Sequence, residues 1–109
     1  SDATKPFIHM TATSYDISDT ANAARFRDAT QKVLIPALKV LAQTLISLAE
    51  READTVQVGR THGQHAVPIT FGYVVAGYVS RLGQSILALE ALAGELKGKF
   101  SGAVGAYNA

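Results

Sequence analysis

Two histidines, an arginine, a threonine and a glutamine lie within ten residues of the chain, between Gly59 and Pro68. His62 stands between Thr61 and Gly63, so a side chain that titrates near neutral pH lies beside a backbone that a ligand can approach closely. A general acid or base needs both properties. The same spacing also fits a helix-connecting turn whose polar groups face water, and spacing alone leaves both interpretations open.

The two histidines of this segment, His62 and His65, lie three residues apart, as two metal ligands on one helical face would. Gly63 and Pro68 disfavour a helix here, and no Glu or Cys completes a set of ligands. We therefore expect no metal at this segment.

A second polar cluster runs from His9 to Asp16, directly ahead of a predicted helix. The first turn of a helix offers free backbone N–H groups and the positive end of the helix dipole, which favour a carboxylate or a phosphate. Thr13 and Ser14 could therefore help to bind an anion. Alternatively, one of them caps the helix while Asp16 completes an arrangement like a capping box.

A third segment, 98–105, contains Gly98, Gly102 and Gly105. It lacks the spacing of a phosphate-binding loop or of a dinucleotide fingerprint, so it predicts the end of a helix followed by a tight turn.

The elements that must position these segments follow from the apolar pattern. Apolar residues recur at helical spacing over about 18–52 and again over about 68–97, so the fold is predicted to be all-α. Residues 53–67 form the connector between the helices, and residues 98–109 form a glycine-rich tail. Pro36 should bend the first helix without ending it.

Both helices are apolar around more than half of their circumference, which two helices cannot hide between themselves. We expect a long antiparallel helical hairpin that associates with copies of itself.

Composition excludes several classes of protein. The net charge is +1 and 17% of residues are charged, so no basic surface points to nucleic acid. The absence of cysteine rules out disulfide scaffolds and suits a reducing cytoplasm. No stretch of about 18 residues is continuously apolar, and we expect no membrane segment.

Together, in this order and on this helical frame, the three segments resemble the adenylosuccinate lyase family of the fumarase and aspartase superfamily. His9 with Thr13-Ser14-Tyr15-Asp16-Ile17 resembles the family's first conserved segment, and Arg60-Thr61-His62-Gly63-Gln64 resembles its second. The glycine-rich residues 98–105, with Tyr107-Asn108-Ala109, resemble the segment that follows. The resemblance spans Phe7 to Ala109.

The resemblance implies an enzyme that eliminates fumarate from adenylosuccinate, giving AMP, and from the succinyl-carboxamide ribotide of purine synthesis. It implies a cytoplasmic homotetramer whose active sites each draw on three subunits, and it implies no cofactor or metal. His62 would be the general acid. The groups that bind the substrate would be His9, Thr13, Ser14, Thr61 and Gln64, with Lys99 a weaker candidate.

The family's third signature, a mobile Gly-Ser-Ser loop that supplies the catalytic serine base, does not occur in this sequence. We therefore expect the chain to be a piece of the central helical domain, inactive on its own. Within the superfamily the alternative is a 3-carboxymuconate cycloisomerase or another member, although cycloisomerases usually lack a histidine at the position of His62. Outside it, the alternative is a non-catalytic helical oligomerisation module.

Overall fold

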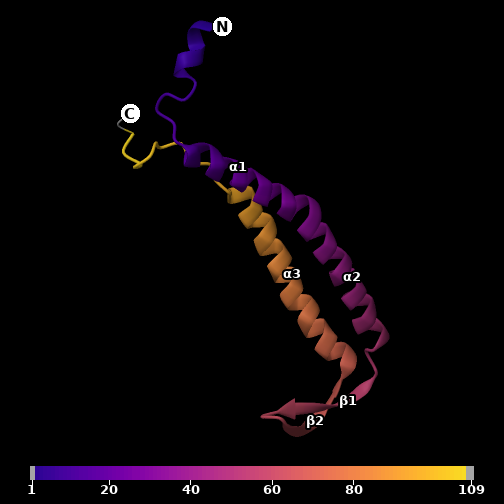
Figure 1. Cartoon of the computed structure of the whole chain (residues 1–109). Helices are drawn as coiled ribbons and strands as arrows, with labels where there is room; N and C mark the ends of the chain where they lie inside the picture. The colour runs from indigo at the N-terminus through magenta and orange to yellow at the C-terminus, as the bar shows by residue number, and fades with distance from the viewer. Residues whose placement is uncertain (1, 108–109) are drawn as a thin grey trace.

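Two long helical segments lie side by side in the computed structural model, which describes residues 2–107, and a small sheet joins them (Figure 1). The last two residues of the predicted tail lie outside the described residues. In chain order the elements are a 3₁₀ helix η1 (Asp2–Phe7), α1 (Ser14–Ala29), a π-helical turn η2 (Thr30–Leu34), α2 (Ile35–Arg51), β1 (Val56–Thr61), β2 (Gln64–Thr70) and α3 (Phe71–Glu95).

The first long helix begins at Ser14, four residues before the predicted start near Ser18. Thr13 has an extended backbone, with φ −120° and ψ 168°, and forms the N-cap. The Asp16 carboxylate accepts a hydrogen bond from the Thr13 N–H at 2.9 Å, which satisfies a donor at the helix terminus. The residues predicted to lie ahead of the helix therefore form its first turn.

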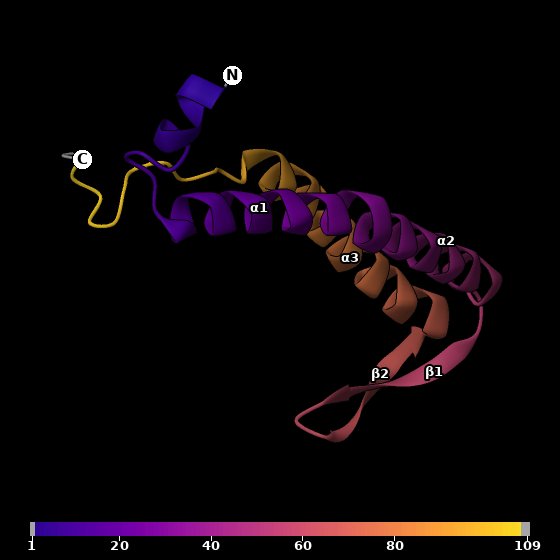
Figure 2. The same cartoon turned by 45° about the horizontal axis from the view of Figure 1, so that its top comes forward.

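Pro36 bends the helix without ending it, as predicted. The bend follows η2, where the Ile35 N–H donates to the carbonyl of Thr30, five residues earlier (Figures 1 and 2). The proline ring would crowd the carbonyl four residues before it, and the wider π-helical turn accommodates this. The first helix is thus continuous from Ser14 to Arg51.

The connector is not a loop but a two-stranded antiparallel hairpin, so the all-α prediction was wrong in this segment and the chain is mostly helical with one small sheet. Val58 pairs with Pro68, which was predicted to open the second helix. Both strands are edge strands, so a proline without an N–H can be accommodated. The helix α3 accordingly begins at Phe71, where the Thr70 hydroxyl caps the Tyr73 N–H, and ends at Glu95.

Helices α2 and α3 pack closely where α3 begins. A Cβ at Gly72 would lie 2.5 Å from the carbonyl oxygen of Ala49 and 2.7 Å from the Cα of Ala53. Further along the pair, the Lys39 ammonium lies 2.7 Å from the Glu90 carboxylate. The early part of α3 therefore lies against the end of α2.

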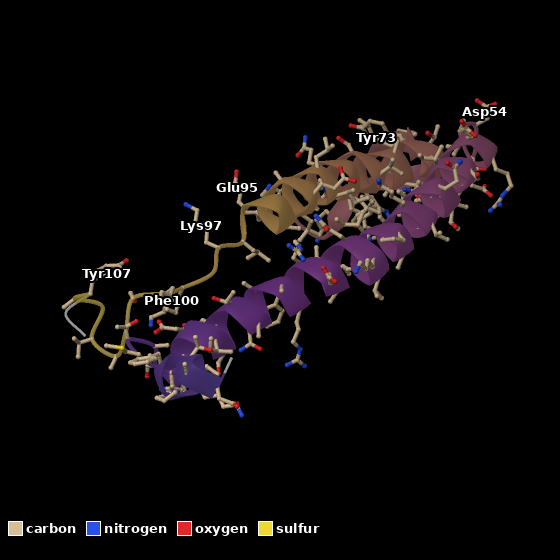
Figure 3. The ribbon with its side chains drawn as sticks, turned by 90° about the horizontal axis from the view of Figure 1, so that it is seen from above. Asp54, Tyr73, Glu95, Lys97, Phe100 and Tyr107 are labelled. Atoms are coloured by element: carbon tan, nitrogen blue, oxygen red, sulfur yellow. The ribbon has the colours of Figure 1, made fainter. Side chains whose placement is uncertain are left out.

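The chain does not enclose a core of its own. Among the described residues, the buried apolar side chains are Ile35, Val75, Ile86 and Ala93. The radius of gyration is 24.2 Å, and the molecule measures 76 × 30 × 16 Å, whereas a compact chain of this length would have a radius of about 13 Å. Side chains project outward along both helical segments, with Tyr73 among those that leave the ribbon (Figure 3).

The segment Ser14–Arg51 is also long and apolar enough to cross a membrane, contrary to the expectation that no segment would be. Length and composition alone carry little weight here, because a core helix of a soluble protein passes the same test.

Replacing Gly72 by alanine should destabilise the protein, because the added methyl group meets the backbone of α2 and one of the two helices must shift. We expect the free energy of unfolding to fall by about 1–3 kcal/mol in thermal or urea denaturation. Gly77 is the matched control, since a Cβ there meets nothing within 4 Å. Gly77→Ala should raise stability by up to about 1 kcal/mol through helix propensity. Equal effects of the two substitutions would contradict the close approach at Gly72.

Candidate active-site segments

The structure places the predicted site residues at two opposite ends of the molecule. Thr61, His62 and Gln64 lie at the tip of the β1–β2 hairpin, whereas His9, Thr13 and Ser14 lie beside the start of α1 (Figure 1). The two groups are separated by the length of the helical pair. A single chain therefore does not bring the expected general acid to the expected anion-binding hydroxyls.

His62 lies in a two-residue turn with an uncommon backbone. Its φ is 51° and that of Gly63 is 72°, while Thr61 pairs with Gln64 on either side. Two positive φ values in succession are typical of the type I′ turn, which matches the twist of a hairpin. Asparagine and glycine adopt this conformation readily, and histidine does so less often. Its place at the tip leaves the His62 side chain exposed.

A β-bulge lies just behind the tip. Val58 pairs with Pro68 and Arg60 pairs with His65, so one residue of β1 faces two residues of β2. The single residue is Gly59, which is buried, and a Cβ there would lie 2.5 Å from the carbonyl oxygen of Val67. A bulge bends its strand and redirects the residues beyond it. Gly59 therefore helps to set the direction of the tip.

The tip favours an anion. Arg60 supplies a positive charge there, and no Asp or Glu occurs between Thr55 and Thr70. Thr61 and Gln64 add neutral hydrogen-bonding groups, and both are exposed. Because the Arg60 guanidinium is not offset by a carboxylate on the hairpin, a carboxylate or phosphate is the chemical class that this tip can attract.

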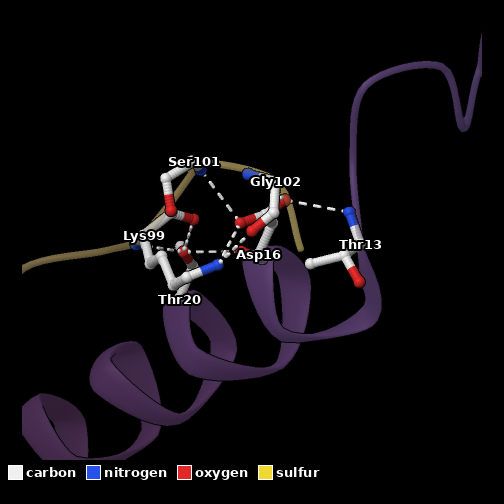
Figure 4. Close-up of polar contacts among 6 residues, drawn as sticks. All are labelled: Thr13, Asp16, Thr20, Lys99, Ser101 and Gly102. Carbon is white, nitrogen blue, oxygen red and sulfur yellow. Dashed lines mark hydrogen bonds and ion pairs between the residues drawn. The ribbon is translucent and has the colours of Figure 1, made fainter. Parts of the chain in front are cut away.

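At the opposite end, the carboxylate of Asp16 joins α1 to the tail (Figure 4). This residue is only 1% exposed. One oxygen, Oδ1, accepts from the Lys99 ammonium at 2.6 Å and from the Ser101 N–H at 3.0 Å. The other, Oδ2, accepts from the Thr13 N–H at 2.9 Å and from the Gly102 N–H at 3.1 Å. Each oxygen therefore accepts two hydrogen bonds.

The charge of Lys99 is directed into this cluster. Its ammonium also donates to the Gly102 carbonyl at 3.1 Å. A lysine whose charge already faces a buried carboxylate is poorly placed to bind a substrate anion. The arrangement thus favours a structural role for Lys99 over the weaker expectation that it binds substrate.

Thr20, one turn along α1, makes a second connection to the tail. Its hydroxyl lies 2.9 Å from the backbone nitrogen of Lys99, whose N–H it accepts, and 3.1 Å from the Lys99 carbonyl oxygen. It also lies 2.9 Å from the Asp16 carbonyl oxygen. Gly98 is needed here, because a Cβ would lie 2.8 Å from that hydroxyl.

The cluster perturbs the titration of Asp16. The hydrogen bond from Lys99 contributes most, followed by the N–H groups of Ser101 and Thr13, and together they hold the pKa of Asp16 well below its usual value. Burial acts in the opposite direction and is outweighed. Asp16 is therefore ionised at neutral pH.

The remaining predicted residues of this end differ in burial. His9 and Ser14 are exposed, and Thr13 is half-buried. A pocket of about 250 Å³ lies between the loop ahead of α1 and the tail, lined by Thr11, by residues 100–104 and by Tyr107. Across the described residues 2–107, no three His, Asp or Glu side chains gather closely enough to hold a metal ion.

Comparison with known proteins identifies the family. A family described as Lyase matches residues 2–109. The chain belongs to this lyase family.

Relatives of the lyase chain carry more specific names. The adenylosuccinate lyase of Pyrococcus abyssi is 43% identical over 100 residues, covering 91% of this chain and 22% of the relative. The N-acetyl-S-(2-succino)cysteine lyase of Enterococcus italicus is 36% identical over 102 residues, covering 93% of this chain and 22% of the relative. The lyase chain therefore spans less than a quarter of the length of these relatives.

A solved structure shares the fold of this lyase chain. The 3-carboxy-cis,cis-muconate lactonizing enzyme from Pseudomonas putida superposes with a TM-score of 0.83 at 36% identity, covering 97% of this chain and 24% of that structure. The long helices and the hairpin therefore occur together within a much larger protein.

The stabilising effect of Asp16 should depend on pH. Because its folded-state pKa lies below the unfolded value of about 3.9, its contribution is complete above that value and is lost as the pH falls toward the folded pKa. We expect the difference in melting temperature between wild type and Asp16→Asn to be constant from about pH 7 to about pH 5 and to shrink below about pH 4.

Asp28 provides the control for this experiment. The hydrogen bonds from Lys32 and Arg27 also lower its pKa, but its carboxylate is exposed. Surface ion pairs contribute little to stability, so Asp28→Asn should change the melting temperature far less at every pH. If the difference in melting temperature between wild type and Asp16→Asn did not change with pH, Asp16 would not be stabilised as a buried carboxylate.

Proposed function

We propose that the chain is part of an adenylosuccinate lyase, which eliminates fumarate from adenylosuccinate and from the succinyl-carboxamide ribotide of purine synthesis. The observation that carries the proposal is the position of His62, exposed at the tip of an electropositive hairpin in an uncommon backbone conformation. Residues held in sparsely populated conformations gather at functional sites. The 43% identity to an adenylosuccinate lyase supports the choice of substrate.

In the proposed reaction, a base removes the proton from the carbon next to a carboxylate of the succinyl group. Electrons move toward that carboxylate, the C–N bond breaks, and His62 donates a proton to the departing nitrogen. Thr61 and Gln64 lie beside His62 on the hairpin, where they can hold oxygens of the succinyl group. His9, Thr13 and Ser14 supply the anion-binding groups of the other segment. The reaction requires no cofactor.

The separation of the two segments supports a site shared between subunits. His62 and Ser14 lie at opposite ends of a molecule 76 Å long, so neighbouring copies are needed to bring one hairpin tip beside another chain's α1. The apolar surface left uncovered by α2 and α3 supplies the driving force for assembly. We therefore propose that the long helices form an antiparallel hairpin. We also propose that the protein assembles into a homotetramer in the cytoplasm.

The 109-residue chain by itself should release no fumarate. Elimination needs a base and an acid on opposite sides of the bond that breaks. The segment that carries the family's serine base is not part of this sequence, so only the acid is present. Fumarate absorbance with adenylosuccinate and the 109-residue chain checks this directly.

A different substrate within the family is the second candidate. The likeness to the muconate lactonizing enzyme favours a cycloisomerase, and the Enterococcus relative favours cleavage of a succinyl thioether. Turnover of adenylosuccinate, 3-carboxymuconate and a succinyl thioether by the full-length protein distinguishes these activities. The absence of turnover with all three would favour a non-catalytic oligomerisation module.

Replacing His62 by asparagine in the full-length protein should separate chemistry from folding. Asparagine adopts positive φ readily and precedes glycine in type I′ turns, so the hairpin should keep its shape. Removing a general acid should lower kcat by about 10²–10⁴-fold with little change in KM. Steady-state kinetics and thermal denaturation give the two measurements.

The control for this experiment is His65→Gln on the neighbouring strand. His65 is exposed and pairs with Arg60, outside the turn, so its replacement should leave kcat within a few-fold of wild type. If His62→Asn retained near-normal kcat, His62 would not be the acid. If only His65→Gln lost activity, the catalytic role would move to that residue.

Mixing two inactive variants tests the shared site. Ser14→Ala and His62→Asn damage segments that the proposal assigns to different subunits. Random hybrid tetramers made from equal amounts should recover about one quarter of wild-type activity, because that fraction of sites draws an intact segment from each chain. Activity should be recovered only when the two variants are unfolded and reassembled in the same mixture. No recovery in verified hybrid tetramers would place both segments of each site in the same subunit.

A further inference from the structure

We infer that Asp16 is a positioning residue of the proposed active site: it fixes the Thr13–Ser14 segment against the Lys99–Gly102 tail so that both can form one wall of the site. This inference rests on the proposed function. Its support is a buried carboxylate that joins parts of the chain more than eighty residues apart, namely α1 and the tail (Figure 4).

The burial of Asp16 excludes direct contact with a substrate in the described structure. At 1% exposure, with two donors on each oxygen, the carboxylate has no free face. Its backbone, however, directly follows Ser14 and Tyr15, and its side chain holds the N–H of Thr13. The carboxylate therefore fixes the backbone at the start of α1, and with it the position of the exposed Ser14.

The tail is fixed by the same two oxygens. The N–H groups of Ser101 and Gly102 both point at the carboxylate, and Gly102 has a φ of 77°. Thr20 makes another hydrogen-bonded connection between α1 and the tail, through the N–H of Lys99. The pocket of about 250 Å³ beside this junction has Thr11 on one side and the tail on the other. Its shape depends on the connection.

An asparagine cannot replace this carboxylate. Each oxygen accepts two hydrogen bonds, so either orientation of the amide places an NH₂ group against two donors. The segment must then move, and a misplacement of about 1 Å in a site that positions reactants can cost about 10²-fold in rate. Asp16→Asn should therefore lower kcat/KM of the full-length protein by about 10- to 100-fold.

The test compares Asp16→Asn, Lys99→Met and Thr20→Val in the full-length protein, with kcat, KM and melting temperature measured for each. Lys99→Met removes the ammonium but keeps the three N–H donors on the carboxylate, and serves as the second variant if Asp16→Asn fails to fold. Thr20→Val removes the other connection between α1 and the tail, and should lower the melting temperature while leaving kcat/KM within a few-fold of wild type. All kinetics are measured well below the lowest melting temperature.

A positioning role predicts that Asp16→Asn lowers kcat/KM and that Lys99→Met lowers it less. Both losses of kcat/KM should be larger than the loss in Thr20→Val when the variants are compared at equal stability. It also predicts weaker binding of fumarate by calorimetry, since the hydroxyls that receive the anion have moved. Kinetics that track melting temperature equally in all three variants would overturn the inference, leaving Asp16 a stabilising residue only. If the wild-type protein showed no lyase turnover, both the proposed function and this inference would be overturned. If wild type and Asp16→Asn were equally active, this inference alone would be overturned.

Discussion

The structure depends on one constraint: α2 and α3 can cover only a small part of each other's apolar surface. The two helical segments meet along a narrow stripe, with Gly72 close against the backbone of α2, and within residues 2–107 few apolar side chains are buried. Most of the apolar residues on both helices remain exposed or only partly buried in the single chain. A chain built in this way leaves most of its apolar surface available for contacts outside itself. The same elongation places the hairpin and the start of α1 at opposite ends.

The two ends hold their candidate site residues by different means. At the hairpin, local backbone geometry suffices, because a two-residue turn and a bulge on β2 opposite Gly59 determine where His62 lies. At the other end, position comes from a long-range contact, because Asp16 gathers donors from α1 and from the tail. The first kind of support involves only residues near one another in the chain. The second requires that α1 and the residues after α3 be present together.

The parts of this arrangement that the sequence predicts are those that depend on local pattern. Helical periodicity predicted both long helices, and the bend at Pro36 followed from its missing N–H. The start of the first helix was misplaced because Thr13-Ser14 and Ser18 both offer capping hydroxyls shortly before an acidic residue, and the structure places the cap at Thr13, whose N–H donates to Asp16. Both strands were missed; the second was obscured because Pro68 suggested a helix start, although a proline also fits an edge strand.

Long-range contacts could not be predicted in the same way. Asp16 was recognised as part of a helix cap, but its partner Lys99 lies 83 positions away, and nothing in the spacing links a carboxylate in one segment to a lysine in another. The positive φ of His62 was equally hidden, since a His-Gly pair indicates a turn without specifying its type. The distance between the two polar clusters also required the fold, because sequence order says nothing about which ends of two helices meet.

This separation has a consequence for how substitutions act. If a site is complete only when neighbouring chains meet, then the apolar stripe along α2 and α3 is as necessary to activity as His62 is. Assembly stabilises the folded subunit by mass action, so a substitution that weakens the helical interface lowers the fraction of complete sites without touching any residue that contacts a substrate. Such a loss depends on protein concentration, whereas the loss of an acid or of a positioning carboxylate does not. Concentration dependence therefore distinguishes residues that build the assembly from residues that act within the site.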